Sequence, residues 1–108
     1  MSSHILSISD ADFQREVLQS EQPVIVDFTA RWCAPCRVLG VTLDALAQEH
    51  AGRVKVTKLD VDDNQATAQQ FGVRSMPTLL FFKGGQVVGQ VVGAVPRARL
   101  EEVLRQVV

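Results

Sequence analysis

Hydrophobic residues recur along the chain in two rhythms, and together these predict strands and helices in alternation. Unalternating apolar runs occupy Ile5–Ile8 and Val24–Phe28, and the second is typical of a strand covered on both faces. Three further strands are expected, at Val54–Val61, Thr78–Phe82 and Gln86–Val92. The segment Lys83-Gly84-Gly85 between the last two favours a tight antiparallel hairpin.

Four segments between or after these strands are expected to form helices, and in the first, second and last of them apolar residues lie three or four positions apart, which is the spacing of a helix with one buried face. The expected helices cover residues 9–18, 37–51, about 62–71 and about 96–107. Gly52 and Gly72 stand where the second and third helices should end. Because strands and helices alternate, we expect an α/β fold with parallel strand pairing and an antiparallel edge.

Polar residues indicate where these helices begin. Ser9 and Asp12 resemble a capping box, residues 62–64 (Asp-Asp-Asn) offer caps for the third helix, and Pro96 lies near the start of the last one. Phe71 should pack inward from the third helix. The other residues expected on buried helix faces are Phe13, Val17, Leu18, Leu39, Leu43, Leu46, Ala47, Leu100, Val103, Leu104 and Val107.

Length and charge narrow the range of functions. The 108 residues suffice for one domain, residues 1–108, and not for two. Eleven basic and 12 acidic residues leave a net charge of −1, which gives no electrostatic footprint for nucleic acid. No apolar run approaches the roughly 18 residues of a membrane span, and residues 1–4 lack the start of a secretory signal. We therefore expect a cytoplasmic protein. Low net charge allows weak self-association but nothing in the sequence requires it, so a monomer is expected.

The two cysteines lie three positions apart in Trp32-Cys33-Ala34-Pro35-Cys36, just before the second helix. The first turn of a helix offers unpaired N–H groups and the positive end of the helix dipole, both of which stabilise a thiolate. In a reducing cytosol such a pair is more often catalytic or metal-binding than structural. A metal would need further ligands, and His4 and His50 have no ligand spacing to the pair. The pattern thus favours disulfide exchange without a metal.

The arrangement resembles the thioredoxin family from about Ile5 to the last helix. The motifs that carry the resemblance are Val-Asp-Phe ending at Phe28, Trp32 to Cys36, Lys58-Leu59-Asp60-Val61-Asp62, Met76-Pro77-Thr78 and Val92-Gly93-Ala94. The resemblance implies a mixed five-stranded sheet flanked by four helices on both faces. It also implies a protein-disulfide reductase that has no cofactor of its own and is recharged by thioredoxin reductase, an NADPH-linked flavoprotein.

The resemblance also assigns roles within the site. Cys33, expected to be the more exposed sulfur, would attack the disulfide of a substrate protein, and Cys36 would resolve the mixed disulfide. Asp27 would assist deprotonation of Cys36, with Lys58 on the next strand as its charge partner. Burial within an apolar strand should raise the pKa of Asp27. By spacing alone, a solvent-facing Asp27 and a surface Lys58 explain the sequence about as well.

An apolar rim around Cys33 would bind the substrate. Its expected members are Trp32, Ala34, Pro35, Val73, Met76, Gly93 and Ala94. Pro77 matches a cis proline of the family that lets the Met76 backbone pair with an extended substrate segment. The alternative is a trans proline that only begins a strand.

Three departures from the family pattern stand near the cysteines. Ala34 replaces a glycine, Thr29 an aromatic residue, and Gly40-Val41 an alanine–proline pair that kinks the helix. Pro35 before Cys36 favours a reductase, because oxidases and isomerases of the family usually carry a histidine there. A dithiol oxidase or isomerase, and a binding module with incidental cysteines, are the competing functions.

Val41→Pro is expected to change the geometry of the second helix and the redox potential of the cysteine pair while the fold survives. The proline removes a backbone donor from the helix interior and bends it. Circular dichroism and a redox titration of the variant measure both effects. An unchanged helix together with an unchanged potential would contradict the prediction.

Overall fold

A computed structural model describes residues 4–108; residues 1–3, part of the segment where no secretory signal is expected, lie outside the described residues. The elements in chain order are β1 (Ile5–Ile8), η1 (Gln14–Leu18), β2 (Val24–Thr29), α1 (Ala34–Glu49), β3 (Lys55–Asp60), α2 (Gln65–Gln70), β4 (Thr78–Lys83), β5 (Gln86–Val92) and α3 (Arg97–Val107). This order confirms the predicted alternation, and the strand bounds differ from those expected by one residue at most.

The five strands form one mixed sheet in the order β1-β3-β2-β4-β5. Parallel pairs join β1 to β3 and β3 to β2, whereas β4 runs antiparallel to both β2 and β5. Gly84 and Gly85 have φ of 61° and 80°, which lets two residues close the hairpin between β4 and β5. The predicted antiparallel edge is therefore confirmed.

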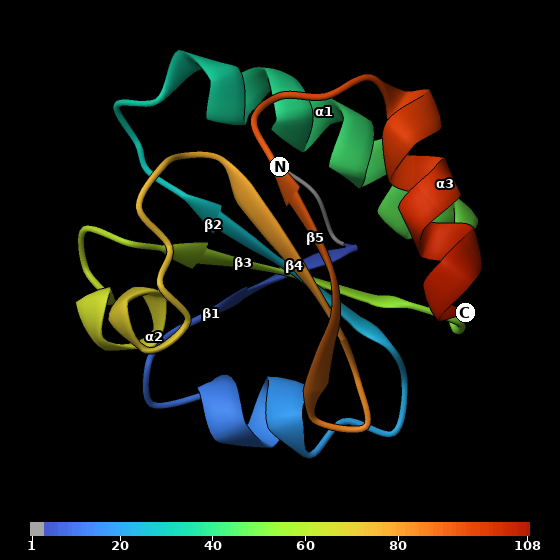
Figure 1. Ribbon diagram of the computed structural model, residues 1–108, viewed down its shortest axis with the longest axis horizontal. Coiled ribbons are helices and arrows are strands. Elements are labelled where there is room, and N and C mark those ends of the chain that lie inside the picture. Colours follow the sequence, from blue (N-terminus) through green and yellow to red (C-terminus); the bar gives the residue numbers. More distant parts are fainter. Residues whose placement is uncertain (1–3) are drawn as a thin grey trace.

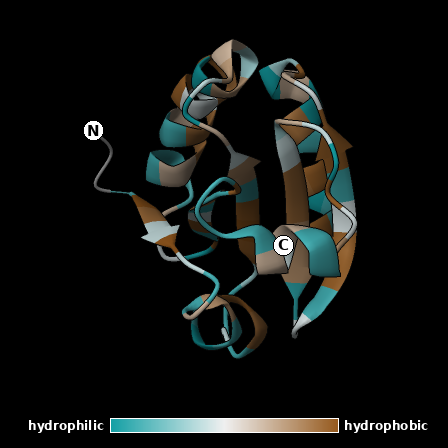
Figure 2. Cartoon of the chain, turned by 90° about the vertical axis from the view of Figure 1, so that its left-hand side faces the viewer, coloured by the Kyte–Doolittle hydropathy of each residue, from teal (hydrophilic) through white to brown (hydrophobic). Residues whose placement is uncertain are grey.

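Helices cover both faces of the sheet, with α1 and α3 on one side and α2 and η1 on the other (Figure 1). Alternate side chains of β2 enter the two layers: Ile25 packs with α1 and α3, while Val26 and Phe28 pack with Phe13 and Phe82. The central strands are hydrophobic along most of their length, and the helices mix hydrophobic and hydrophilic residues (Figure 2). By the same alternation, Asp27 faces α1.

Three helices differ from their expected extent, and in α2 the difference is a start at Gln65 and not near residue 62. The first is a five-residue π-helical turn, η1, and not a helix over residues 9–18, although Ser9 Oγ does donate to Asp12 Oδ2 at 3.0 Å. The second begins at Ala34 and not at Arg37, because Pro35 suits a first turn where its missing N–H costs nothing. Within residues 4–108, no helix combines the length and the apolar character needed to cross a membrane.

The cap of α2 comes from a distant part of the chain, which corrects the prediction that residues 62–64 supply it. Asn64 occupies the cap position, but its side chain does not cap the helix. Asp10 instead accepts the N–H groups of Ala66 and Thr67 at 3.2 and 2.9 Å, and the Thr67 hydroxyl at 2.6 Å. The Asp10 N–H in turn donates to Asn64 Oδ1 at 2.9 Å. The loop after β1 is thus fastened to α2.

Asp10→Ala is expected to lower the free energy of unfolding by about 1–2 kcal/mol at pH 7, because the first turn of α2 loses its acceptor. Burial acts to raise the pKa of Asp10, but the hydrogen bonds from Thr67 and Ala66 lower it overall from 3.8. The stabilisation is therefore present above pH 3.8 and lost as the pH falls through the lowered pKa. Denaturant titrations at pH 7 and pH 2 measure it.

Asp44→Ala is the matched control, since Asp44 makes no hydrogen bond or ion pair in the described part of the chain. It should not lower the stability at either pH, and its helical position predicts a gain of about 0.5 kcal/mol from the higher helix propensity of alanine. Equal stability of Asp10→Ala and the parent protein at pH 7 would show that the distant cap contributes nothing.

Candidate active site at the start of α1

Cys33 and Cys36 form a disulfide across the first turn of α1, with their Cα atoms 5.3 Å apart. Cys33 is the N-cap residue, and its sulfur accepts the Cys36 N–H at 3.2 Å. The Cys33 N–H donates to the Ala30 carbonyl at 3.2 Å, which closes the turn between β2 and the helix. A helix N-terminus that points a backbone donor at one sulfur favours negative charge on that sulfur, so Cys33 is the cysteine suited to be a thiolate.

Both cysteines are buried, with exposed fractions of 4% for Cys33 and 3% for Cys36. By residue, Cys33 is slightly the more exposed of the two in the disulfide form, which is the direction expected. Ala30, Val61 and Met76 pack around the pair. This small cluster encloses the disulfide at the surface end of the core.

Asp27 is buried, as predicted, with an exposed fraction of 5%. Its neighbours in the sheet are Lys58 on β3 and Leu79 on β4. Burial raises the pKa of Asp27 to about 7, against an opposing effect of the Lys58 charge. Among the described residues no group donates a hydrogen bond to Asp27 Oδ1, and the exposed Lys58 forms no direct ion pair with it. Asp27 is thus a buried acid able to exchange a proton near neutral pH.

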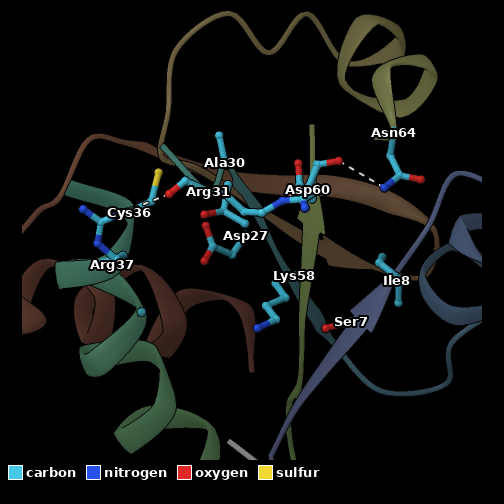
Figure 3. A pocket seen from close by; sticks show the side chains of 12 residues that line it. Ser7, Ile8, Asp27, Ala30, Arg31, Cys36, Arg37, Lys58, Asp60 and Asn64 are labelled. Atoms are coloured by element: carbon cyan, nitrogen blue, oxygen red, sulfur yellow. Dashed lines mark hydrogen bonds and ion pairs between the residues drawn. The ribbon is translucent and has the colours of Figure 1, made fainter. Parts of the chain in front are cut away.

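Asp27, Lys58 and Cys36 line one pocket of about 570 Å³ between α1 and the sheet. Figure 3 shows Asp27 below Cys36, with Lys58 extending from the neighbouring strand. Thr29 and Gly40, two of the departures from the family pattern, also line this pocket. Thr29 and Gly40 are smaller than the aromatic residue and the alanine that the family pattern has at these positions. Both therefore leave more room beside the Asp27 carboxyl group.

Trp32 is 69% exposed, and its Nε1 donates to Asp62 Oδ2 at 2.9 Å. Together with Val73 and Met76 it lines a second pocket of about 390 Å³, against one side of α2. These three members of the expected rim are therefore brought together along one shallow pocket.

The remaining rim residues occupy separate positions. The Met76–Pro77 bond is cis, as predicted, and the buried Pro77 accepts the Gly93 N–H at 2.8 Å through its carbonyl. Ala34 and Pro35 are exposed at the start of α1, and Ala94 is exposed after β5. The Gly93–Pro77 hydrogen bond joins Gly93 to the loop that contains Pro77.

Sequence reasoning missed the contacts that hold the loop before Cys33. Arg31 Nε donates to Asp60 Oδ2 at 2.9 Å, and its guanidinium also pairs with Asp63. Arg37 Nη1 donates to the Arg31 carbonyl at 2.9 Å. The sequence indicated Asp60 only as part of a family motif and Asp63 only as a helix cap, because partners that lie 29 and 32 positions apart leave no local signal.

The acidic side chains near the site do not form a metal centre. Residues 4–108 contain no group of three or more His, Cys, Asp or Glu side chains placed to hold a metal ion. The start of α1 brings two sulfurs close to one buried acid.

Comparisons with known proteins agree with this chemistry. The family model for thioredoxin matches residues 4–106. The thioredoxin of Haemophilus influenzae is 53% identical over 104 residues, which cover 96% of this chain and 97% of that protein. A thioredoxin of Synechocystis sp. is 52% identical over 92% of both chains, and thioredoxin 1 of Nostoc sp. is 48% identical over the same share. With such identities along nearly its whole length, the chain belongs to the thioredoxin family of protein-disulfide reductases.

Proposed function

We propose that Cys33 and Cys36 carry out disulfide reduction in this protein, with Cys33 as the attacking and Cys36 as the resolving thiol. The hydrogen bond from the Cys36 N–H to Cys33 Sγ, at the N-cap of α1, is the observation that carries this assignment. We further propose that the chain acts as a single-domain monomer in the cytoplasm. Thioredoxin reductase, an NADPH-linked flavoprotein, would return the disulfide to the dithiol.

In the first step, the Cys33 thiolate attacks one sulfur of a substrate disulfide. That S–S bond breaks, the second substrate sulfur leaves with the electron pair, and Cys33 is left in a mixed disulfide. The Cys36 N–H and the dipole of α1 stabilise the Cys33 thiolate before the attack. The fraction of nucleophile available at neutral pH is therefore raised.

In the second step, Cys36 must lose its proton before it can attack Cys33. Asp27 is the proposed acceptor, because it lines the same pocket as Cys36 and its pKa of about 7 suits proton exchange at neutral pH. The Cys36 thiolate then displaces the substrate, which leaves as a dithiol, and the Cys33–Cys36 disulfide forms. Lys58 acts at longer range by favouring the ionised form of Asp27.

The proposed substrate surface surrounds Cys33. Trp32, Val73 and Met76 supply a hollow that suits an apolar side chain of the substrate. Ala34, Pro35 and Ala94 offer exposed area near the disulfide, and Gly93 holds the loop that contains Pro77. This surface also suits the reductase partner, because both partners must reach the same sulfur.

Cys33→Ser is expected to abolish turnover of a disulfide-bonded test protein, whereas Cys36→Ser should accumulate a covalent mixed disulfide with it. Only the first variant lacks the attacking sulfur, and only the second lacks the group that resolves the intermediate. Non-reducing electrophoresis and mass spectrometry separate the two outcomes. Turnover by Cys33→Ser would overturn the assignment.

A redox titration of the unmodified protein is the control for the direction of the reaction. A potential well below that of the glutathione pool, about −240 mV, is expected for a reductase. A potential well above that value would favour an oxidase or isomerase.

Asp27→Asn is expected to remove most of the pH dependence of stability between pH 4 and pH 8. The folded pKa of Asp27 is about 7 against 3.8 for the free carboxyl group, so the folded state binds the proton more tightly. The contribution of Asp27 to stability is therefore fully present below pH 3.8 and is lost as the pH rises through 7. Relative to Asp27→Asn, the parent should lose about 4 kcal/mol over this range. Denaturant titrations of the two disulfide forms test it, and parallel pH profiles would contradict the raised pKa.

A further inference from the structure

Met76 is the only methionine among the described residues, and it contacts two parts of the site. It packs against the buried cluster that contains Cys33 and Cys36. It also lines the pocket of about 390 Å³ beside Trp32, which we call the Trp32 pocket. Val61 has the same two sets of contacts, but its side chain is a hydrocarbon. Met76 therefore brings a reactive thioether to both the disulfide cluster and the proposed substrate surface.

The Trp32 pocket lets a small molecule reach Met76 from solvent. Met76 is half-buried, and Arg74 and Ser75, which line the same pocket, are exposed. The pocket volume of about 390 Å³ far exceeds the roughly 30 Å³ that a water molecule occupies in the liquid. Hydrogen peroxide has only one oxygen atom more than water, so the pocket admits it to Met76.

In the disulfide form, Met76 carries the only sulfur of residues 4–108 that is not already oxidised. Cys33 and Cys36 are bonded to each other, and no free cysteine remains in the described part of the chain. The disulfide thus protects both cysteines from peroxide, and the thioether is the sulfur that remains to react. A methionine sulfoxide is removed by its own dedicated reductases, and not by exchange between thiols and disulfides.

We propose that Met76 is a site of reversible oxidation by hydrogen peroxide, and that its sulfoxide weakens the binding of substrate proteins at the Trp32 pocket. The inference rests on the proposed function and its substrate surface. The thioether sulfur attacks one oxygen of the peroxide, the O–O bond breaks and an S=O bond forms. The thioether loses two electrons and the peroxide gains them. Its second oxygen leaves as water, after taking the proton of the transferred hydroxyl group.

Oxidation changes the surface that a substrate side chain would contact. Val61, Ala68 and Val73 line the Trp32 pocket with hydrocarbon, and the thioether of Met76 belongs to the same apolar wall. A sulfoxide oxygen is a hydrogen-bond acceptor, and Arg74 at this pocket has no hydrogen-bond or ion-pair partner in the described part of the chain. A bond from Arg74 to this oxygen would occupy space intended for the substrate. The oxidised pocket is therefore more polar and less open.

Treatment of the disulfide form with hydrogen peroxide tests the inference. Peptide mapping by mass spectrometry should find one added oxygen at Met76, and the same map identifies any oxidation of Met1. The peroxide is then removed, and dithiothreitol restores the dithiol but leaves the sulfoxide in place. We expect kcat/KM for a disulfide-bonded test protein to fall about tenfold, mainly through KM, because an apolar binding contact is lost.

Two variants separate the effect at Met76 from general oxidative damage. Met76→Leu keeps an apolar side chain but cannot form a sulfoxide. Because position 76 belongs to the proposed substrate surface, each variant is compared only with its own untreated sample. Met76→Leu/Val88→Met moves the thioether to β5, where Val88 is 50% exposed. Peroxide should leave kcat/KM unchanged in both variants, and an equal loss in either of them would overturn the inference.

Reversal gives a second readout. A mixture of the two methionine sulfoxide reductases, one for each sulfoxide epimer, should remove the oxygen from Met76 and restore the KM of the untreated protein. Removal of the oxygen without recovery of KM would show that the loss arose elsewhere. A loss confined to kcat would indicate damage to the thiol chemistry and would contradict an effect on binding.

The proposed function and this inference fail in distinguishable ways. If the untreated dithiol form does not reduce the test protein, the proposed function is wrong and the inference falls with it. If the untreated protein turns over but Met76 takes up no oxygen, or its sulfoxide leaves kcat/KM unchanged, only the inference is overturned.

Discussion

The hydrogen bond between the Cys36 N–H and Cys33 Sγ couples the chemistry of this protein to its fold. The same bond caps α1 and stabilises charge on the attacking sulfur, so the helix and the thiolate each depend on the other. The rest of the structure serves to hold that helix end in place. β2 leads directly into it, and the contacts of Arg31 and Trp32 fix the short loop between them.

The burial of Asp27 in the middle of the sheet lowers the stability of the fold at neutral pH. β2 is the middle strand, and its other side chains from Val24 to Phe28 are apolar and enclosed. An ionised carboxyl group is destabilised in that environment. This unfavourable free energy of ionisation is what raises the pKa of Asp27 to about 7. The pocket under α1 limits the cost, because it keeps the carboxyl group within reach of solvent and of the Lys58 charge.

Local patterns in the sequence were enough for the strands, the hairpin and most helices. An uninterrupted apolar run identified β2, helical spacing identified the buried face of α1, and the glycines marked turns because they alone adopt positive φ readily. The resemblance to thioredoxin supplied the burial of Asp27 and the cis bond before Pro77, which spacing left open. The Asp10 cap and the Arg31 contacts escaped prediction because each joins segments that only the tertiary fold brings together. The near-equal burial of the two cysteines likewise depends on packing by Val61 and Met76.

Trp32 is the only tryptophan of the chain, and there is no tyrosine. Its indole is largely exposed and is hydrogen-bonded to Asp62 beside the active site. Intrinsic fluorescence of this protein therefore originates at a single place, and that place is the active-site loop. An unfolding curve recorded by fluorescence would follow the release of this loop, so a second probe of the sheet, such as far-ultraviolet circular dichroism, is needed to establish two-state behaviour.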